Sequence, residues 1–158
     1  MLDEYERHQG VVLRQLVVGS TTPLGLVAIR RGGRVNAFII NGAIGVFVKH
    51  SSMRLSPWTY TFHRGQAKDF LELERQCVET FVSFVCGSDG TLAISSAELR
   101  QLIDLELQTQ SWIRVERKRR GQYAVSGTRG FLQHKVVQGV SPIVAAVRSG
   151  GIQERQNE

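Results

Sequence analysis

The sequence predicts a single α+β domain, in which a mostly antiparallel sheet is flanked by about three helices. The chain has 158 residues, of which 42% are hydrophobic and 22% are charged, as in an ordinary globular domain. Several short apolar or alternating segments are typical of strands, and glycine-marked turns join them in pairs. Strand pairs of this kind favour antiparallel hairpins with helices packed to one side.

The C-terminal end differs in composition from the rest of the chain. From Arg148 onward the sequence is polar and rich in glycine. We therefore expect the domain to span residues 1–147 and residues 148–158 to form a polar, frayed tail.

The first third of the chain predicts a helix followed by a meander of strands. Apolar residues recur at near-helical spacing over residues 2–18, and a loop follows over 19–23. Gly32-Gly33 and Asn41-Gly42 then mark two tight turns, because glycine reaches the positive φ that such turns need. The strands beside these turns are expected at residues 24–30, 34–40 and 44–50.

The middle of the chain contains the clearest strand pattern. Aromatic and polar residues alternate over 58–63, which predicts a half-buried strand. Residues 66–76 carry apolar side chains on one helical face, and residues 78–86 form an apolar, β-rich run that predicts a central strand. Asp89-Gly90 is expected to turn that strand into another over 91–94.

The last third begins with a helix signal. Ser95 precedes Glu98 by three residues, which is the spacing of a capping box at a helix N-terminus. Further strands are expected at residues 111–119, 122–126 and 131–137.

The net positive charge of the chain comes from residues 111–158. The formal net charge is +6 and the isoelectric point is near 9.9. Residues 1–110 hold 11 basic and 11 acidic residues, whereas residues 111–158 hold 9 basic and 3 acidic residues. A basic region attracts polyanions such as nucleic acid.

A basic hairpin carries most of this excess. With alternating side-chain directions, a strand beginning at Ser111 becomes basic toward its turn, and aromatic residues stand nearby. Such a hairpin could follow a phosphate backbone and stack on bases. The alternative is a solvated charge cluster that protects a sheet edge from aggregation. The candidate nucleic-acid-binding residues are Arg114, Arg117, Lys118, Arg119, Arg120 and Tyr123, with Trp112 close by.

The strand ending at Lys49 carries a second candidate. A helix, a strand meander and a lysine that ends one strand resemble the restriction-endonuclease-like, PD-(D/E)xK nucleases over residues 1–86. The resemblance implies that Lys49 matches the motif's lysine, that Phe47 replaces its acid, and that Asn41 stands near its aspartate. Phenylalanine cannot bind a hard cation, which needs oxygen ligands, so the resemblance implies an inactive site.

The segment after this strand is polar and basic. Residues 49–58 are also similar to a motif of bacterial proteins of uncharacterised function. Lys49, His50 and Arg54, together with neighbouring serines, could form an anion pocket that suits phosphate. The alternative is a polar loop whose serines bond its own backbone.

The remaining signals argue against a resident cofactor. Cys77 and Cys86 are nine residues apart, fit no zinc spacing and are expected to be buried thiols in a reducing cytoplasm. The sequence contains no phosphate-binding glycine loop, and we expect no cofactor, no metal and no catalytic residue. The charged N-terminus and the absence of a long apolar run predict a cytoplasmic protein without a membrane segment.

These observations lead to one functional expectation and two alternatives. We expect a non-catalytic accessory domain that binds nucleic acid through the C-terminal basic hairpin. The first alternative is a protein-interaction or structural domain with an acidic partner. The second is a metal-dependent nuclease with a non-standard site, using carboxylates such as Asp69, Glu72 or Glu79. The sequence leaves open the choice between DNA and RNA, and the oligomeric state.

Overall fold

The computed structural model describes the backbone of residues 1–106 and 109–156, and the side chains of residues 1–106 and 109–150. Within these residues the fold is α+β with four helices and eight strands, which confirms the expected class and adds one helix. The helices are α1 (Glu4–Gly19), α2 (Arg64–Gln76), α3 (Ser96–Leu102) and α4 (Ser141–Gln156). The strands are β1 (Leu26–Arg31), β2 (Arg34–Ile40), β3 (Ile44–Ser51), β4 (Trp58–Phe62), β5 (Glu79–Cys86), β6 (Gly90–Ser95), β7 (Ser111–Arg117) and β8 (Tyr123–Gly127).

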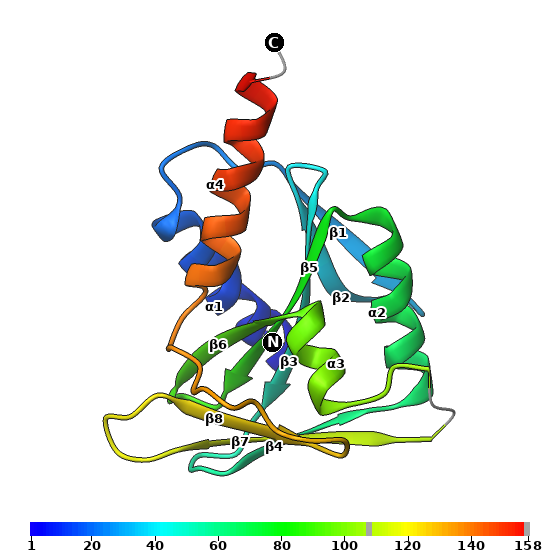
Figure 1. The fold of residues 1–158 in the computed structure, drawn as a ribbon, viewed down its shortest axis with the longest axis vertical. Coiled ribbons are helices and arrows are strands. Elements are labelled where there is room, and N and C mark those ends of the chain that lie inside the picture. The colour runs from blue at the N-terminus through cyan, green and yellow to red at the C-terminus, as the bar shows by residue number, and fades with distance from the viewer. Residues whose placement is uncertain (107–108, 157–158) are drawn as a thin grey trace.

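The strands form two sheets. Five of them pair in the order β1-β2-β3-β5-β6, and the other three in the order β4-β7-β8. Only β3 and β5 pair in parallel among the named strands; the other pairs are antiparallel. The connection from β3 to β5 passes through β4 and α2, so β4 leaves the large sheet. The three-stranded sheet lies across the lower end of the molecule in Figure 1.

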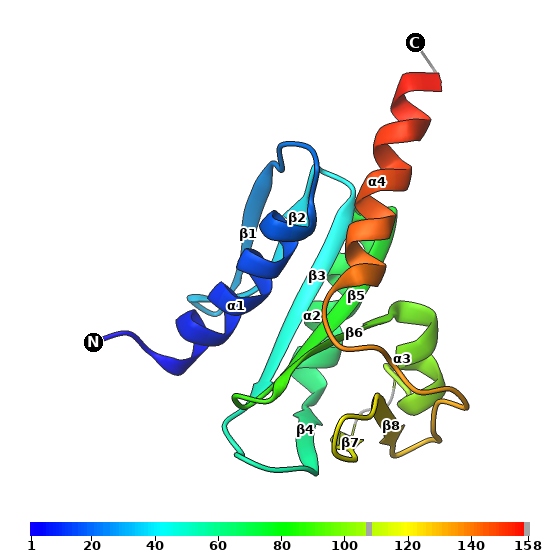
Figure 2. The same cartoon turned by 90° about the vertical axis from the view of Figure 1, so that its left-hand side faces the viewer.

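Helices cover both faces of the five-stranded sheet (Figure 2). On one face, α1 and α4 bury Val12, Leu16 and Ile143 against β2, β3 and β5. On the other face, α2 and α3 form a second apolar cluster with the inner face of the three-stranded sheet. Side chains of β3 alternate between the two clusters, with Val46 in the first and Phe47 in the second. By the same alternation, the side chains of Lys49 and His50 point to opposite faces of the sheet.

Local sequence signals account for the turns and helix starts. Gly32 and Gly33 have φ of 60° and 81°, and Asn41 and Gly42 have φ of 52° and 68°, as tight hairpin turns require. The Ser95 side chain accepts a hydrogen bond from the Glu98 amide, and the Glu98 side chain accepts one from the Ser95 amide. The predicted capping box is therefore confirmed at α3.

The C-terminal third departs from the sequence expectation in one of its predicted strands. Residues 131–137 form no named strand and pair only through single bridges, Tyr123 with Val136 and Ser126 with Phe131. A domain over residues 1–147 with a frayed tail over 148–158 stays a prediction; α4 runs from Ser141 to Gln156 across that boundary, and residues 157–158 lie outside the described residues. Among the described residues, none of the helices has the length and hydropathy needed to cross a bilayer.

Candidate nucleic-acid interface and the Lys49 pocket

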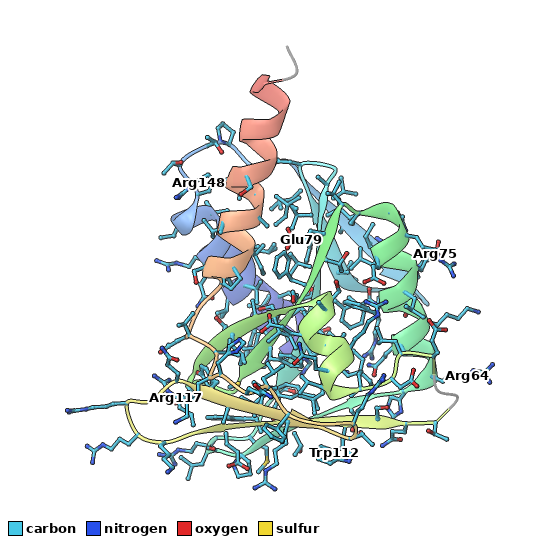
Figure 3. All side chains as sticks on the ribbon, in the orientation of Figure 1. Arg64, Arg75, Glu79, Trp112, Arg117 and Arg148 are labelled. Atoms are coloured by element: carbon cyan, nitrogen blue, oxygen red, sulfur yellow. The ribbon has the colours of Figure 1, made fainter. Side chains whose placement is uncertain are left out.

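Strand β7 separates an apolar face from a solvated one. Ile113 and Val115 are fully buried against the core, whereas Trp112, Arg114 and Glu116 are exposed. The alternation expected from the sequence is therefore present between residues 111 and 116. The outer face of the β4-β7-β8 sheet is the solvated side of this strand, and Figure 3 shows Trp112 on it.

Two aromatic side chains lie exposed on this outer face. The registers Thr59–Arg114, Arg114–Ser126 and Ser126–Phe131 place Phe131 in one cross-strand row with Arg114. Directly paired residues of antiparallel strands project to the same side, so the row lies on the outer face. Trp112 is 45% exposed and Phe131 is 69% exposed. Phe131 was not singled out from the sequence, because its place on this face depends on the bridge to Ser126.

The β7–β8 turn presents three basic side chains. Lys118, Arg119 and Arg120 are exposed, and within the described part of the chain none of them forms an ion pair. Arg120 has φ of 61°, a conformation that the turn imposes on it. By contrast, Arg114 is paired with Glu116, with 2.6 Å between Nε and Oε1. Among the basic residues of the hairpin, the three in the turn are therefore the most available to an external anion.

Arg117 and Tyr123 hold the hairpin in place and do not extend toward solvent. The Arg117 guanidinium donates to Asp89 Oδ2 at 2.9 Å and to Gln138 Oε1 at 2.9 Å, and its Nε donates to the Gly121 carbonyl at 2.8 Å. The hydrogen bond that Arg117 donates to the Asp89 carboxylate raises the pKa of Arg117 above its ordinary value. Tyr123 is fully buried and donates to Asp89 Oδ2 at 2.7 Å.

This network corrects the expected set of contact residues. A buried ring cannot stack on a base, and a guanidinium held by a carboxylate and an amide is not free for a phosphate. Tyr123 and Arg117 are therefore positioning residues for the turn. The candidate contacts on this face are therefore Arg114, Lys118, Arg119 and Arg120, with Trp112 and Phe131 as the aromatic surface.

Lys49 turns into the protein at the end of β3. Its Nζ donates to the Thr61 carbonyl of β4 at 2.6 Å and to Gln66 Oε1 of α2 at 3.0 Å. The same nitrogen lies 4.8 Å from the centre of the Phe62 ring. Burial lowers the pKa of Lys49 from 10.5 to about 8. All three contacts are with neutral groups, so the ammonium is held without a neighbouring carboxylate bound to it.

His50 projects to the opposite face of the sheet. Its ring stacks on His8 of α1 with 4.5 Å between centroids, and it meets the Tyr5 ring edge-on at 4.6 Å. Burial, and then the charge of His8, lowers its pKa. Arg54 is exposed in the loop before β4. The expected anion pocket of Lys49, His50 and Arg54 is therefore not formed as one cluster.

A small pocket opens beside Lys49, where two strands separate. The pairing of β2 with β3 stops at Ala37 and Phe47, while β3 continues to pair with β5 as far as Ser51. The resulting cavity measures about 60 Å³. Its walls are formed by Tyr5, Asn36, Phe47, Val48, Lys49, His50 and Gln66.

Asn36 and Gln66 are the pocket residues that sequence reasoning missed. Asn36 Nδ2 donates to Asp69 Oδ2 of α2 at 3.2 Å. Asn41, which the resemblance placed near the site, instead lies in the β2–β3 turn, where its side chain accepts from the Gly25 amide at 2.8 Å. That turn begins β3, whereas Lys49 is near the end of β3, so Asn41 is distant from the pocket along the strand. Only the strand register identifies Asn36, since asparagine in a strand carries no motif.

The carboxylates considered for a metal-dependent nuclease, Asp69, Glu72 and Glu79, lie in different parts of the structure. Asp69 is bound to Asn36 beside the pocket, and Glu72 pairs with Arg75 at 3.2 Å. Glu79 is exposed at the start of β5, whereas Lys49 aligns with Phe84 near its end (Figure 3). Across the residues that the structure describes, no group of three or more histidine, cysteine, aspartate or glutamate side chains is arranged to hold a metal ion.

The two cysteines are both free thiols. Cys86 is fully buried, its sulfur lies 3.2 Å from the Tyr60 hydroxyl, and burial raises its pKa to about 12. Cys77 is partly buried, and burial raises its pKa as well. Raised pKa values keep both sulfurs protonated at neutral pH, whereas the thiolate is the nucleophilic form.

No protein-family model, curated protein or solved structure matches this chain, so none of them bears on the resemblance to the restriction-endonuclease-like nucleases.

Proposed function

We propose that the protein is a non-catalytic accessory domain that binds single-stranded nucleic acid on the outer face of the β4-β7-β8 sheet. The observation that carries this proposal is the combination of two exposed aromatic rings with a basic turn on one sheet. Trp112 and Phe131 supply surfaces on which bases stack, and Lys118, Arg119 and Arg120 supply charge for phosphates.

The geometry of the face suits an extended strand. Phe131 lies two strand spacings from β7, which is roughly 10 Å across the sheet. A flexible single strand can bring successive bases to rings at such separations, whereas the stacked bases of a duplex are not accessible. The Arg117 hydrogen bonds to Gly121, Asp89 and Gln138 tie the base of the turn to the domain, so the turn stays at the end of the sheet that carries the rings.

Removing the turn charges should weaken binding and flatten its dependence on salt. The test variant carries Lys118→Gln, Arg119→Gln and Arg120→Asn, since asparagine tolerates the positive φ at position 120. For single strands each lost phosphate contact reduces the log–log salt slope by about 0.7, so we expect a reduction of about 2 and an affinity loss of about 10- to 100-fold at low salt. The measurement is fluorescence anisotropy of labelled oligo(dT) and oligo(U) between about 50 and 200 mM NaCl.

A matched control removes three charges from another surface. Arg64→Gln, Lys68→Gln and Arg75→Gln alter exposed residues of α2, on the other side of the molecule from Arg117 in Figure 3. This variant should bind as the wild type does, and circular dichroism should show that both variants are folded. Equal loss in the two variants would indicate a diffuse charge effect and contradict a defined interface. Binding to an acidic peptide but to neither oligonucleotide would favour the protein-interaction alternative.

A further inference from the structure

We propose that the opening between β2 and β3 is a second binding site, for a compact oxyanion of the phosphate class, with Lys49 as its principal ligand. This site lies apart from the outer face of the small sheet and does not depend on the function proposed for that face. Its evidence is the chemistry of the pocket walls.

The first argument is the state of the lysine. An ammonium group has three hydrogens. Lys49 directs two of them to neutral oxygens, the Thr61 carbonyl and Gln66 Oε1, and forms no ion pair with any described residue. A charge withdrawn from water is normally compensated by an opposite charge. The ammonium also lies over the Phe62 ring, which carries no charge, and a bound anion accounts for the missing negative charge.

The second argument is the abundance of donors around this ammonium. Gln66 uses its oxygen to accept from Lys49 and from the His63 amide, which orients its NH₂ group as a donor. Gln66 is also the third residue of α2, so the pocket adjoins a helix N-terminus, where amide groups and the helix dipole favour negative charge. The edge of β3 beyond Phe47 is unpaired on the side of β2, which leaves backbone groups facing the opening.

The third argument is the size of the pocket. A volume of about 60 Å³ is enough for a few water-sized groups, which suits a compact ion. A tetrahedral oxyanion combines small size with several acceptor oxygens, so it can take the Lys49 hydrogen and neighbouring donors together. Among the described residues, Asp69 is the one carboxylate bonded to a wall residue, Asn36, and its negative charge limits the affinity of the pocket for anions.

The charge of Lys49 predicts how binding depends on pH. Because burial lowers its pKa to about 8, the ammonium should lose its proton, and the site its anion, as pH rises above that value. The other titratable or charged groups near the pocket are Asp69 on α2, Tyr5 and His50 in the pocket wall, Arg34 over the Tyr5 ring, and Asp3, Glu4 and His8 at the start of α1 around His50. The pKa of His50 is lowered, so it is neutral throughout a titration from pH 7 to 9.5.

The test uses inorganic sulfate, whose charge is constant over this pH range, and inorganic phosphate at pH 7. Isothermal titration calorimetry of the wild-type chain in chloride buffer should detect saturable binding of both ions below about 10 mM. The sulfate affinity should fall roughly tenfold for each pH unit above about 8. Lys49→Met should abolish binding at every pH, and Lys68→Met, which alters an exposed lysine of α2, should leave it unchanged.

Three results would overturn the site: no binding by the wild type, the same affinity in Lys49→Met, or a sulfate affinity that does not change with pH. The pH series needs only the wild type, so it decides the matter even if Lys49→Met does not fold. An oligonucleotide titration identifies the source of the phosphate. If Lys49→Met loses sulfate and also binds oligo(dT) more weakly, the site takes a backbone phosphate. If it loses only sulfate, the site takes a free oxyanion. The outer-face proposal is unaffected by either result.

Discussion

Replacing Gly127 with alanine should destabilise the protein by about 2–3 kcal/mol. Gly127 is the last residue of β8, and a Cβ built there would lie 2.5 Å from the Leu102 carbonyl oxygen and 3.0 Å from the Leu102 carbonyl carbon. Both are backbone atoms at the end of α3, so the added methyl group can be relieved only by moving β8 or the helix. Urea unfolding followed by circular dichroism measures the change.

The contact matters because it fixes the small sheet on the core. The same Leu102 carbonyl accepts a hydrogen bond from the Arg129 amide at 2.7 Å, so β8 and the segment after it both rest on the end of α3. Gly10→Ala in α1 is the matched control. A Cβ at Gly10 meets nothing within 4 Å, and alanine favours helix, so this variant should be more stable by about 0.5–1 kcal/mol. A Gly127→Ala protein as stable as the wild type would show that β8 does not lie this close to α3.

Replacing Lys49 with methionine should remove a rise in stability between pH 8 and pH 10.5. The pKa of Lys49 is about 8 in the folded protein and 10.5 as the ordinary value. Between these values the unfolded chain binds a proton that the folded chain does not, so the free energy of unfolding increases with pH. With partial exposure to solvent taken into account, the gain should be on the order of 1–3 kcal/mol.

The difference between the two proteins isolates this contribution. Cys86 acts in the opposite sense, because its pKa is raised from 9.0 to about 12, so the unfolded chain loses that proton first and stability falls above about pH 9. Both proteins contain Cys86, and its effect cancels in the subtraction. The measurement is urea unfolding from pH 7 to 10 in chloride buffer, without sulfate or phosphate. If the stability of Lys49→Met and of the wild type changed in parallel with pH, the pKa of Lys49 would not be lowered in the folded protein.

Much of the fold could be predicted because its signals are local. The turns at Gly32-Gly33 and Asn41-Gly42 depend on the φ values of the residues themselves, and the capping box at Ser95 depends on two residues three positions apart. Aromatic alternation likewise located β4 within one residue of its end. Each of these signals acts over a few residues, so no knowledge of the tertiary structure is needed to interpret it.

The arrangement of strands into two sheets could not be predicted in the same way. The parallel pairing of β3 with β5, and the departure of β4 to join β7, depend on how the apolar faces pack in three dimensions. The start of α4 was missed although Val140, Ile143, Val144 and Val147 follow helical spacing. The glycines after Arg148 favour an irregular tail when the sequence is considered alone, whereas the first turns of α4 pack on the sheet.

In the candidate site, too, some features follow from the local sequence and others depend on the tertiary structure. The charge of the β7–β8 turn is evident in the sequence, but the roles of its residues depend on distant partners. Arg117 is bound to Asp89 and Gln138, which lie on other segments, and these contacts distinguish it from Lys118 next to it. In the Lys49 pocket, alternation along β3 already implies that Lys49 and His50 point to opposite faces. The participation of Asn36 required the strand register.

The emission of Trp112 during titration with an oligonucleotide tests the proposed interface most directly. The chain has two tryptophans, and Trp58 is buried with its indole nitrogen bonded to the Met53 carbonyl, so only Trp112 can stack on a base. Saturable quenching by oligo(dT) or oligo(U) is expected in the wild type. Trp112→Leu should show none and should bind about 5- to 100-fold more weakly, since stacking contributes about 1–3 kcal/mol per base. Unchanged affinity in a folded Trp112→Leu protein, or binding without quenching in the wild type, would contradict the account.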